Sequence, residues 1–496
     1  MKKQITKHFM AFFLSMVMIM AMGLTAFADE STTYTLTLKG TSEGHIYEVY
    51  QIFTGDISTN EDGKKVLSNV KWGTGVTHTE TESAADVAKA LGDGTKTLDL
   101  LVESHTLTTL FRTMTSSKDS TVIDGLAAGY YLVKDQDGSQ KDKSDAYTKF
   151  IVQVVGNTEA DIKSGVPTVV KKVKDTNDTT GKTSDWQDSA DADVGDDVDY
   201  QITGTMPGNI KDYTTYKYMF TDTMSKGLTY TAGKTTIKIG ETNVTDSFEE
   251  AVTTNDDGKT TVTWTCNDLK KIDGVTLNKD TKVVVTYSAK LNKDAVIGAT
   301  GNPNTVNLTY SNNPNKGGEG ETGKTPDDKN IVFTYETVVN KVDQDKKSLK
   351  GAAFKLEKKL SDGTYKEVKS FTAGEETTFA FTGLDDGEYK LTETTTPTGY
   401  NTITPIEFKI SATHETTSAD PKLTELSVDV TAGKAEFTAE TAAGSLTTDI
   451  ENKKGSTLPS TGGRGTTMIY IIGAALVITA GVVLVMRKKM SSDKEA

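Results

Sequence analysis

Apolar and polar residues alternate along most of this chain with a period of two, which is typical of half-buried β-strands. The alternation is clearest at residues 34–38, 261–264, 282–287 and 306–310, which are rich in valine, threonine and aromatic residues. Glycine, asparagine and aspartate bound these segments, as is usual at turns between short strands. The pattern predicts a mainly β protein made of antiparallel β-sandwiches.

Two segments favour helix instead, residues 84–91 and 98–114, both in the first third of the chain. Polar residues at 156–167 and a stretch dense in glycine, asparagine and proline at 312–330 interrupt the strand pattern and indicate linkers. We therefore expect three domains of roughly 150 residues each, the usual size of a domain. Their expected bounds are 29–165, 166–330 and 331–453.

Residues 1–28 have the organisation of a secretory signal peptide. Three lysines precede an apolar run at residues 9–24, and the small-residue sequence Ala26-Phe27-Ala28 follows it. This order predicts cleavage after Ala28 and secretion of the remaining chain.

The C-terminal segment, residues 454–496, contains a second apolar run at 468–486 and a basic triplet at 487–489. The run is uncharged and long enough to cross a membrane as a helix, and the triplet predicts a cytoplasmic end. A pentapeptide stands before the run: Leu458, Pro459, Ser460, Thr461 and Gly462. Together these parts resemble the LPxTG cell-wall sorting signal of Gram-positive surface proteins. The resemblance implies that a sortase cleaves between Thr461 and Gly462, so that the helix anchors the chain only transiently.

The formal net charge of the chain is −14, and processing at both ends removes more basic than acidic residues. A chain this acidic is a poor partner for nucleic acid or for an anionic membrane. The single cysteine, Cys266, allows no internal disulfide and is expected to be a small buried apolar residue. The five histidines are scattered, and the motifs of zinc proteases, serine hydrolases and P-loops are absent from the sequence. We therefore expect no metal site, no cofactor and no enzymatic activity.

The expected third domain carries a lysine in its first long strand, Lys341, and an asparagine in its last strand, Asn452. Between them, Glu393 lies in the sequence Leu-Thr-Glu-Thr-Thr-Thr-Pro-Thr-Gly-Tyr that begins at Leu391. This arrangement resembles the CnaB-type (SpaA-like) domains of surface adhesins and pilins. The resemblance implies an Ig-like sandwich in which Lys341 and Asn452 form an intramolecular isopeptide bond, assisted by Glu393.

The chemistry of such a bond follows from burial. Burial favours the neutral, nucleophilic form of a lysine amine and the protonated form of a glutamate. A protonated carboxyl can then hydrogen-bond the asparagine amide and polarise its carbonyl group while the amine attacks and ammonia leaves. We expect these roles for Lys341, Glu393 and Asn452.

The expected second domain has a parallel set of residues. Strand parity places Lys171 on the face of Val169 and Val173, the expected core face, and places Asn304 on the apolar face of the expected last strand. We therefore prefer the pair Lys171 and Asn304 to its alternative, Lys172 with Asn307. The stretch that begins at Tyr218 and contains Asp222 resembles CnaA-like pilin domains, in which an acid of this kind assists bond formation.

The expected first domain shows no complete set of this kind. Lys39 lies in its first strand, but the stretch around Tyr130 lacks a glutamate box. We expect no isopeptide bond in this domain.

Sortase-assembled pilins also use a lysine near the end of the first domain as acceptor for the sorting-signal threonine of the next subunit. Lys163 has this position, within Ala160-Asp-Ile-Lys-Ser-Gly-Val-Pro167, although the tyrosine and proline of the family motif are missing. The nearest rivals are Lys141 and Lys149, of which Lys149 lies in an expected strand. We expect Lys163 to be the acceptor.

These features predict the backbone subunit of a covalent Gram-positive pilus, of tandem CnaA/CnaB-type Ig-like sandwiches, anchored to the cell wall. Expected partners are other copies of the chain, a class C pilin sortase, a housekeeping sortase, peptidoglycan and ancillary pilins, but not nucleic acid. One alternative is a monomeric wall-anchored adhesin that binds a host ligand and needs no acceptor lysine. The pattern is also compatible with a pilus tip or basal subunit, and it favours a secreted enzyme least.

Overall fold

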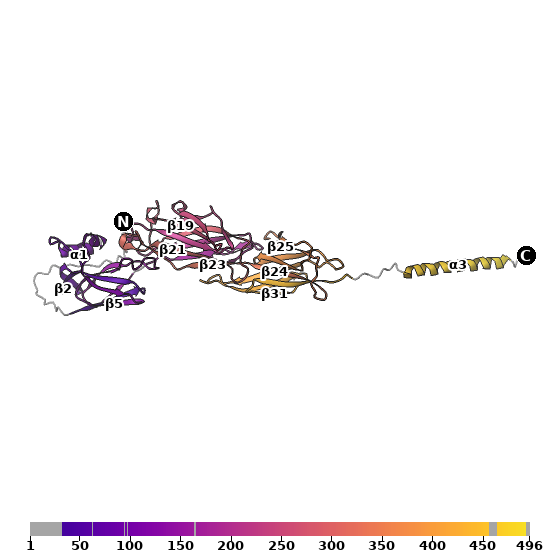
Figure 1. The fold of residues 1–496 in the computed structure, drawn as a ribbon, viewed down its shortest axis with the longest axis horizontal. Coiled ribbons are helices and arrows are strands. Elements are labelled where there is room, and N and C mark those ends of the chain that lie inside the picture. Colours follow the sequence, from indigo (N-terminus) through magenta and orange to yellow (C-terminus); the bar gives the residue numbers. More distant parts are fainter. Residues whose placement is uncertain are drawn as a thin grey trace, which may run out of the picture.

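Three β domains follow one another along the long axis of the molecule (Figure 1). The structure, a computed structural model, describes residues 32–61, 63–93, 95–96, 98–162, 165–455 and 464–492. The prediction of tandem β-sandwiches with a C-terminal apolar helix is confirmed. The predictions for the signal peptide and Ala28, for Lys163 and for the pentapeptide 458–462 lie outside the described residues.

The first domain has two sheets, a three-stranded one in the order β5-β1-β8 and a larger one in the order β3-β2-β6-β7, with β4 also paired to β2. The strands are β1 (Tyr34–Thr41), β2 (Ile46–Thr59), β3 (Lys65–Trp72), β4 (Leu110–Thr115), β5 (Asp119–Leu126), β6 (Gly129–Asp135), β7 (Lys149–Val154) and β8 (Thr158–Asp161). The first and last strands, β1 and β8, are parallel neighbours.

Two helices, α1 (Ala84–Gly92) and α2 (Leu98–Ser104), cover the larger sheet of this domain, and α1 packs on β3. The side chain of Ser83 caps α1 by accepting a hydrogen bond from the backbone nitrogen of Asp86. The expected helix at 98–114 is wrong beyond Ser104, because the chain then enters β4. Pairing of β4 with the edge of β2 satisfies its backbone groups, so tertiary contact decides the structure against a weak helical pattern.

The second domain is a sandwich of two sheets, β12-β23-β21-β14-β19-β18 with β22 attached, and β17-β16-β20-β13-β9 with β15 attached. Its strands are β9 (Val169–Val173), β10 (Thr176–Asn177), β11 (Lys182–Thr183), β12 (Ser189–Asp191), β13 (Asp197–Thr205), β14 (Tyr218–Met224), β15 (Leu228–Tyr230), β16 (Thr236–Ile239), β17 (Thr242–Asn243), β18 (Glu249–Thr254), β19 (Thr260–Cys266), β20 (Lys282–Leu291), β21 (Asn302–Ser311), β22 (Thr322–Lys324) and β23 (Asp328–Phe333). Short 3₁₀ turns lie at Ile210–Asp212, Thr245–Ser247, Leu269–Lys271 and Pro314–Lys316.

The stretch 312–330 is not the simple linker that its composition indicated. It contains β22 and the first half of β23, and both strands pair with β21. The sequence predicted that β21 is the last strand of the second domain. This is wrong, because β23 follows β21 in the same sheet. Composition misses these strands because their pairing with β21, which lies outside the local sequence pattern, decides their structure.

The third domain is a sandwich of the sheets β27-β24-β32-β31 and β26-β25-β28-β29-β30. Its strands are β24 (Tyr335–Asp343), β25 (Ala353–Lys359), β26 (Tyr365–Ser370), β27 (Thr378–Leu384), β28 (Gly387–Thr395), β29 (Ile406–His414), β30 (Leu423–Ala432), β31 (Phe437–Glu440) and β32 (Ser445–Asn452). Its first and last strands, β24 and β32, are parallel neighbours over eight residue pairs.

The second and third domains are joined without a loop. Only Thr334 separates β23 from β24, and its hydroxyl donates a hydrogen bond to the carbonyl oxygen of Leu384. Val332 packs into the core of the second domain, whereas Ile331 and Phe333 pack into the core of the third. Consecutive side chains of one strand thus belong to two cores, which fixes the junction between the domains.

A single helix, α3 (Arg464–Ser492), follows the third domain. Its segment Met468–Lys488 has a mean hydropathy of 2.6 and none of it is buried against the rest of the protein. By length and composition it can cross a membrane, as the sequence predicted.

Candidate functional site

Lys341, Glu393 and Asn452 come from β24, β28 and β32 and meet in the interior of the third domain. All three side chains are buried. In the parallel pairing of β24 and β32, Lys341 lies opposite Ile450. Ile450 precedes Asn452 by two residues, so the side chains of Ile450 and Asn452 are on the same face of the sheet. The parallel register therefore directs the lysine and the asparagine to one place.

The carboxyl group of Glu393 lies between the amine and the amide. Its Oε2 accepts a hydrogen bond from Asn452 Nδ2 at 3.0 Å, and its Oε1 lies 4.0 Å from Lys341 Nζ. Lys341 Nζ itself donates a hydrogen bond to the carbonyl oxygen of Ile450 at 2.7 Å. Among the described residues, neither Glu393 Oε1 nor Asn452 Oδ1 has a hydrogen-bond partner, although both atoms are buried.

This geometry refines one detail of the expected chemistry. The carboxyl group was expected to hydrogen-bond the amide of Asn452 and to polarise its carbonyl, and the observed hydrogen bond is to the amide nitrogen, which is the leaving group. A carboxyl group in this position can take a proton from the lysine amine and pass it to the departing nitrogen. The bond Lys341 Nζ–Asn452 Cγ would form, the bond Asn452 Cγ–Nδ2 would break, and Nδ2 would leave as ammonia.

The amine of Lys341 is poised for such an attack. Burial lowers its pKa to about 8, even though the nearby carboxylates of Glu393 and Glu451 oppose this shift. A substantial fraction of the side chain is therefore neutral and nucleophilic near physiological pH.

The second domain contains a related cluster of Lys171, Asp222 and Asn304, on β9, β14 and β21, all fully buried. Lys171 Nζ donates a hydrogen bond to Asp222 Oδ1 at 2.5 Å. Burial lowers the pKa of Lys171, although the charge of Asp222 works against it. As in the third domain, a lysine, an acid and an asparagine share one water-excluded space.

Tyr287 on β20 is the centre of this second cluster, and sequence reasoning missed it. Its hydroxyl donates to Asp222 Oδ2 at 2.6 Å and accepts from Lys171 Nζ at 2.5 Å and from Asn304 Nδ2 at 2.9 Å. Its ring stacks on Tyr200, and Lys171 Nζ lies 5.0 Å from both ring centres. Strand alternation in residues 282–287 could have placed Tyr287 inside, but not beside Lys171.

Replacing Tyr287 with phenylalanine should slow covalent linkage of Lys171 to Asn304 without unfolding the domain. The ring packing survives, but Asp222 Oδ2 and Asn304 Nδ2 lose their shared hydrogen-bond partner. Loss of one positioned proton carrier typically reduces a rate by about 10²- to 10⁴-fold. Intact-mass measurements over time after synthesis would show the unlinked form persisting. Linkage at the wild-type rate would contradict this role, and Tyr230→Phe, a partly exposed tyrosine of the same domain, is the matched control.

The alternative pair, Lys172 and Asn307, is not brought together. Lys172 points to the surface and pairs with Asp188, whereas Asn307 donates a hydrogen bond to Asp327. A further buried amide, Asn330 on β23, lies opposite Asn304, and its side-chain atoms have no partner among the described residues.

The first domain has a different buried polar group. None of its described lysines is buried, and Lys39 forms an exposed pair with Glu159 at 2.5 Å. Instead His45 lies in the interior, with its Nδ1 2.9 Å from Asp135 and its Nε2 3.5 Å from Asp145. Burial by itself lowers the pKa of His45, but the hydrogen bonds and charges of the two aspartates outweigh it and raise the pKa to about 9.

The stability of the first domain should therefore fall as pH rises. The pKa of His45 is raised above its unfolded value of about 6.5, so the ion pairs stabilise fully below that pH and are lost as pH rises through about 9. The contribution is about 3 kcal/mol. Amide hydrogen exchange in β2 and β6 should show this added stability at pH 6, and His45→Gln should abolish the added stability. The exposed His78→Gln is the control, and equal protection of the wild type at pH 6 and pH 10 would contradict the assignment.

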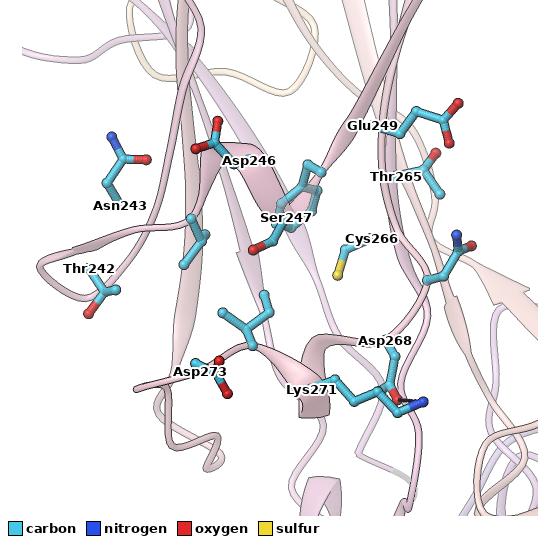
Figure 2. Close-up of a pocket in the computed structure, with 14 residues that line it drawn as sticks. Thr242, Asn243, Asp246, Ser247, Glu249, Thr265, Cys266, Asp268, Lys271 and Asp273 are labelled. Carbon is cyan, nitrogen blue, oxygen red and sulfur yellow. Dashed lines mark ion pairs between the residues drawn. The ribbon is translucent and has the colours of Figure 1, made fainter.

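A surface hollow of about 640 Å³ lies in the second domain (Figure 2). It is lined by polar residues such as Asp246 and Asp273 and contains no member of either lysine cluster. Cys266 borders it, but burial raises the pKa of its thiol, which disfavours the reactive thiolate. The thiol of Cys266 is therefore a poor nucleophile in this hollow.

Comparison with known proteins gives three family matches within the chain. Residues 194–314 match the Gram-positive pilin backbone subunit 2, Cna-B-like domain; residues 336–423 match a prealbumin-like fold domain, SpaA; and residues 450–492 match the LPXTG cell wall anchor motif. The Cna-B-like description of the second domain differs from the CnaA-like type that the stretch around Asp222 indicated.

Single proteins match over nearly the whole chain. The trypsin-resistant surface T6 protein of Streptococcus pyogenes serotype M6 is 26% identical, covering 96% of this chain and 99% of that protein. The structure of the T6 backbone pilin of serotype M6 Streptococcus pyogenes, with a modular three-domain organisation, covers 86% of this chain and 99% of its own at 19% identity and a TM-score of 0.52. The structure of the full-length major pilin SpaD from Corynebacterium diphtheriae covers 86% of this chain and 99% of its own, at 20% identity and a TM-score of 0.49.

Proposed function

We infer that this chain, with its Gram-positive pilin backbone domain and its LPXTG anchor, is the backbone subunit of a surface pilus that is covalently anchored to the cell wall. The observation that carries this conclusion is the combination, in one chain, of the two matches with a linear row of three β domains. It is a structural protein and not an enzyme. Its partners are further pilin subunits, a sortase and the cell wall.

Polymerisation would join the carbonyl carbon of Thr461 to the amine of Lys163 in the next subunit. Cleavage of the bond between Thr461 and Gly462 supplies an acyl group, and attack by the neutral lysine amine forms an amide. Lys163 directly follows β8 and Ile162 in the chain and precedes β9, so it belongs to the boundary between the first two domains. One acyl donor and one acceptor for each subunit make a head-to-tail contact, which propagates instead of closing.

Two enzymes would handle the same acyl group. A class C pilin sortase would transfer Thr461 to Lys163, and a housekeeping sortase would transfer it to peptidoglycan and end the fibre. Ancillary pilins are further candidate partners.

Within each subunit, Lys341 with Asn452 and Lys171 with Asn304 would form isopeptide bonds. The burial of both lysines, the lowered pKa of each amine and the contact of an acid with each cluster support these bonds. Linkage would also remove two buried amines whose desolvation is costly.

The function is tested on cell-wall extracts that are boiled in SDS and separated by size. A backbone subunit gives a ladder of high-mass species that contain this chain. A single band at the mass of one subunit would instead identify the monomeric adhesin.

A further inference from the structure

A group of acidic residues and one histidine lies where the second domain contacts the third. Asp175 and Asp191 belong to the second domain, and His414 ends β29 of the third. His414 Nε2 lies 3.4 Å from Asp175 Oδ2 and 3.9 Å from Asp191 Oδ1. The three ligand atoms all lie within 4.8 Å of one another.

The hydrogen bonds of His414 fix the orientation and the tautomer of its ring. Ser189 Oγ donates its only hydrogen to the carbonyl oxygen of Glu415 at 2.7 Å, so it must accept from His414 Nδ1, also at 2.7 Å. The neutral ring therefore presents the lone pair of Nε2 to two carboxylates. A lone pair facing carboxylates repels them unless a proton or a metal ion lies between, and a hydrogen bond at the far ring nitrogen is typical of metal-binding histidines.

A buried tyrosine points to the same place. The hydroxyl of Tyr335 is fully buried and has no hydrogen-bond partner of normal geometry among the described residues. Its side chain interacts with Asp191, and the charges of Asp386 and Asp175 also act on it, which places the hydroxyl beside this cluster. The hydroxyl is therefore in a position to contact an ion held by these acids.

A neighbouring acidic group shows what is missing. Asp178 and Asp193 surround the buried amine of Lys358, which lies 2.7 Å from Asp193 and also pairs with Asp385. No described lysine or arginine forms an ion pair with Asp175 or Asp191. The group around Lys358 thus has its cation, and the group around His414 does not.

We propose that Asp175, Asp191 and His414 bind a divalent metal ion of the zinc type, which holds the second domain to the third. Zinc bonds of about 2.0–2.2 Å in tetrahedral geometry separate ligand atoms by about 3.3–3.6 Å, close to the distances observed. One imidazole with two carboxylates suits zinc, whereas calcium takes six to eight oxygen ligands. The hydroxyl of Tyr335 or a water molecule would complete the coordination. Sequence motifs do not reveal this site, because its ligands come from two domains.

Calorimetric titration of the metal-free secreted chain, residues 29–461, with zinc chloride would test the site. We expect one zinc ion for each chain, and His414→Gln and Asp191→Asn should each weaken binding by at least about tenfold. Ser189→Ala should weaken it less, because it removes only the hydrogen bond that orients the ring. The controls are His78→Gln, which removes an exposed histidine, and Asp178→Asn, which alters the neighbouring acidic group.

Native mass spectrometry gives a second readout that does not depend on heat changes, and circular dichroism shows that each variant is folded. Equal zinc binding by the wild type and His414→Gln would overturn the proposal. So would the absence of stoichiometric zinc binding. Binding of calcium or magnesium without zinc would overturn the choice of metal.

Discussion

The intact secreted chain should weigh about 34 Da less than its sequence mass, because each of two lysine–asparagine bonds expels one ammonia of about 17 Da. Glu393→Gln should halve this deficit. Glutamine has nearly the shape of glutamate, but it cannot move the proton from Lys341 to the leaving nitrogen of Asn452. High-resolution mass spectrometry of the purified chain measures the deficit directly, and peptide mapping would locate each bond.

The same substitution should destabilise the third domain strongly. A bond between Lys341 and Asn452 closes nearly the whole domain, and constraining a loop of about 100 residues contributes about 4–5 kcal/mol in the unfolded state. For a domain of this size, that corresponds to a fall in Tm of roughly 20–30 °C. Differential scanning calorimetry would show this fall as one unfolding transition that moves to a lower temperature.

Glu388→Gln provides the matched control, because Glu388 lies on the same strand, β28, but pairs with Lys359 at the surface. It should leave both the mass deficit and the melting of the third domain unchanged. A wild-type chain at its full sequence mass would refute both intramolecular bonds. A full deficit in Glu393→Gln would show that the carboxyl group is not needed.

Lys163→Ala should abolish the high-mass ladder and leave one band at the mass of a single wall-anchored subunit. Alanine removes the only nucleophile that the proposed joint supplies, while the sorting signal remains available for transfer to peptidoglycan. The effect should therefore be nearly complete loss of polymer without loss of surface display. Boiled cell-wall extracts and immunoelectron microscopy of the cells measure the two consequences separately.

Lys141→Ala and Lys149→Ala are the controls, because they are the nearest rival acceptors. Lys149 belongs to β7 and pairs across to Lys134, so its backbone is fixed in a sheet. Lys141 lies in the segment that docks the first domain on the second, where the backbone nitrogen of Asp142 donates to the carbonyl oxygen of Thr322. A ladder that persists in Lys163→Ala and disappears in one of these variants would move the joint to that lysine.

The sequence predicted those features that depend on local periodicity. Alternation in residues 169–173 placed Lys171 inside and Lys172 outside, and the structure has them so. Parity succeeds here because a slip by one residue would turn every side chain of β9 to the opposite face.

Features that depend on distant pairing could not be predicted in this way. Residues 105–114 and 312–330 have weak local preferences, and their strands form because β2 and β21 offer unpaired edges. Tyr287 enters the cluster of the second domain only through the register of β20 with β13, which no local pattern encodes. Asp175 and Asp191 are likewise distant from His414 in sequence, and they meet it only where the two domains are in contact.

The position of Lys163 has a mechanical consequence for the first domain. When a fibre is pulled, force would enter each subunit at Lys163, pass through the second and third domains, and leave at Thr461. In the third domain it would cross directly from β24 to β32 through the bond at Asn452, so the chain between them carries no load. In the second domain it would pass from β9 to β21. Residues 305–333 would then be kept from extending by non-covalent contacts, such as the sheet hydrogen bonds of β23 and the core packing of Val332. The first domain precedes Lys163 in the chain, so the proposed path of force does not pass through it, and it would need no covalent bond of its own to carry load.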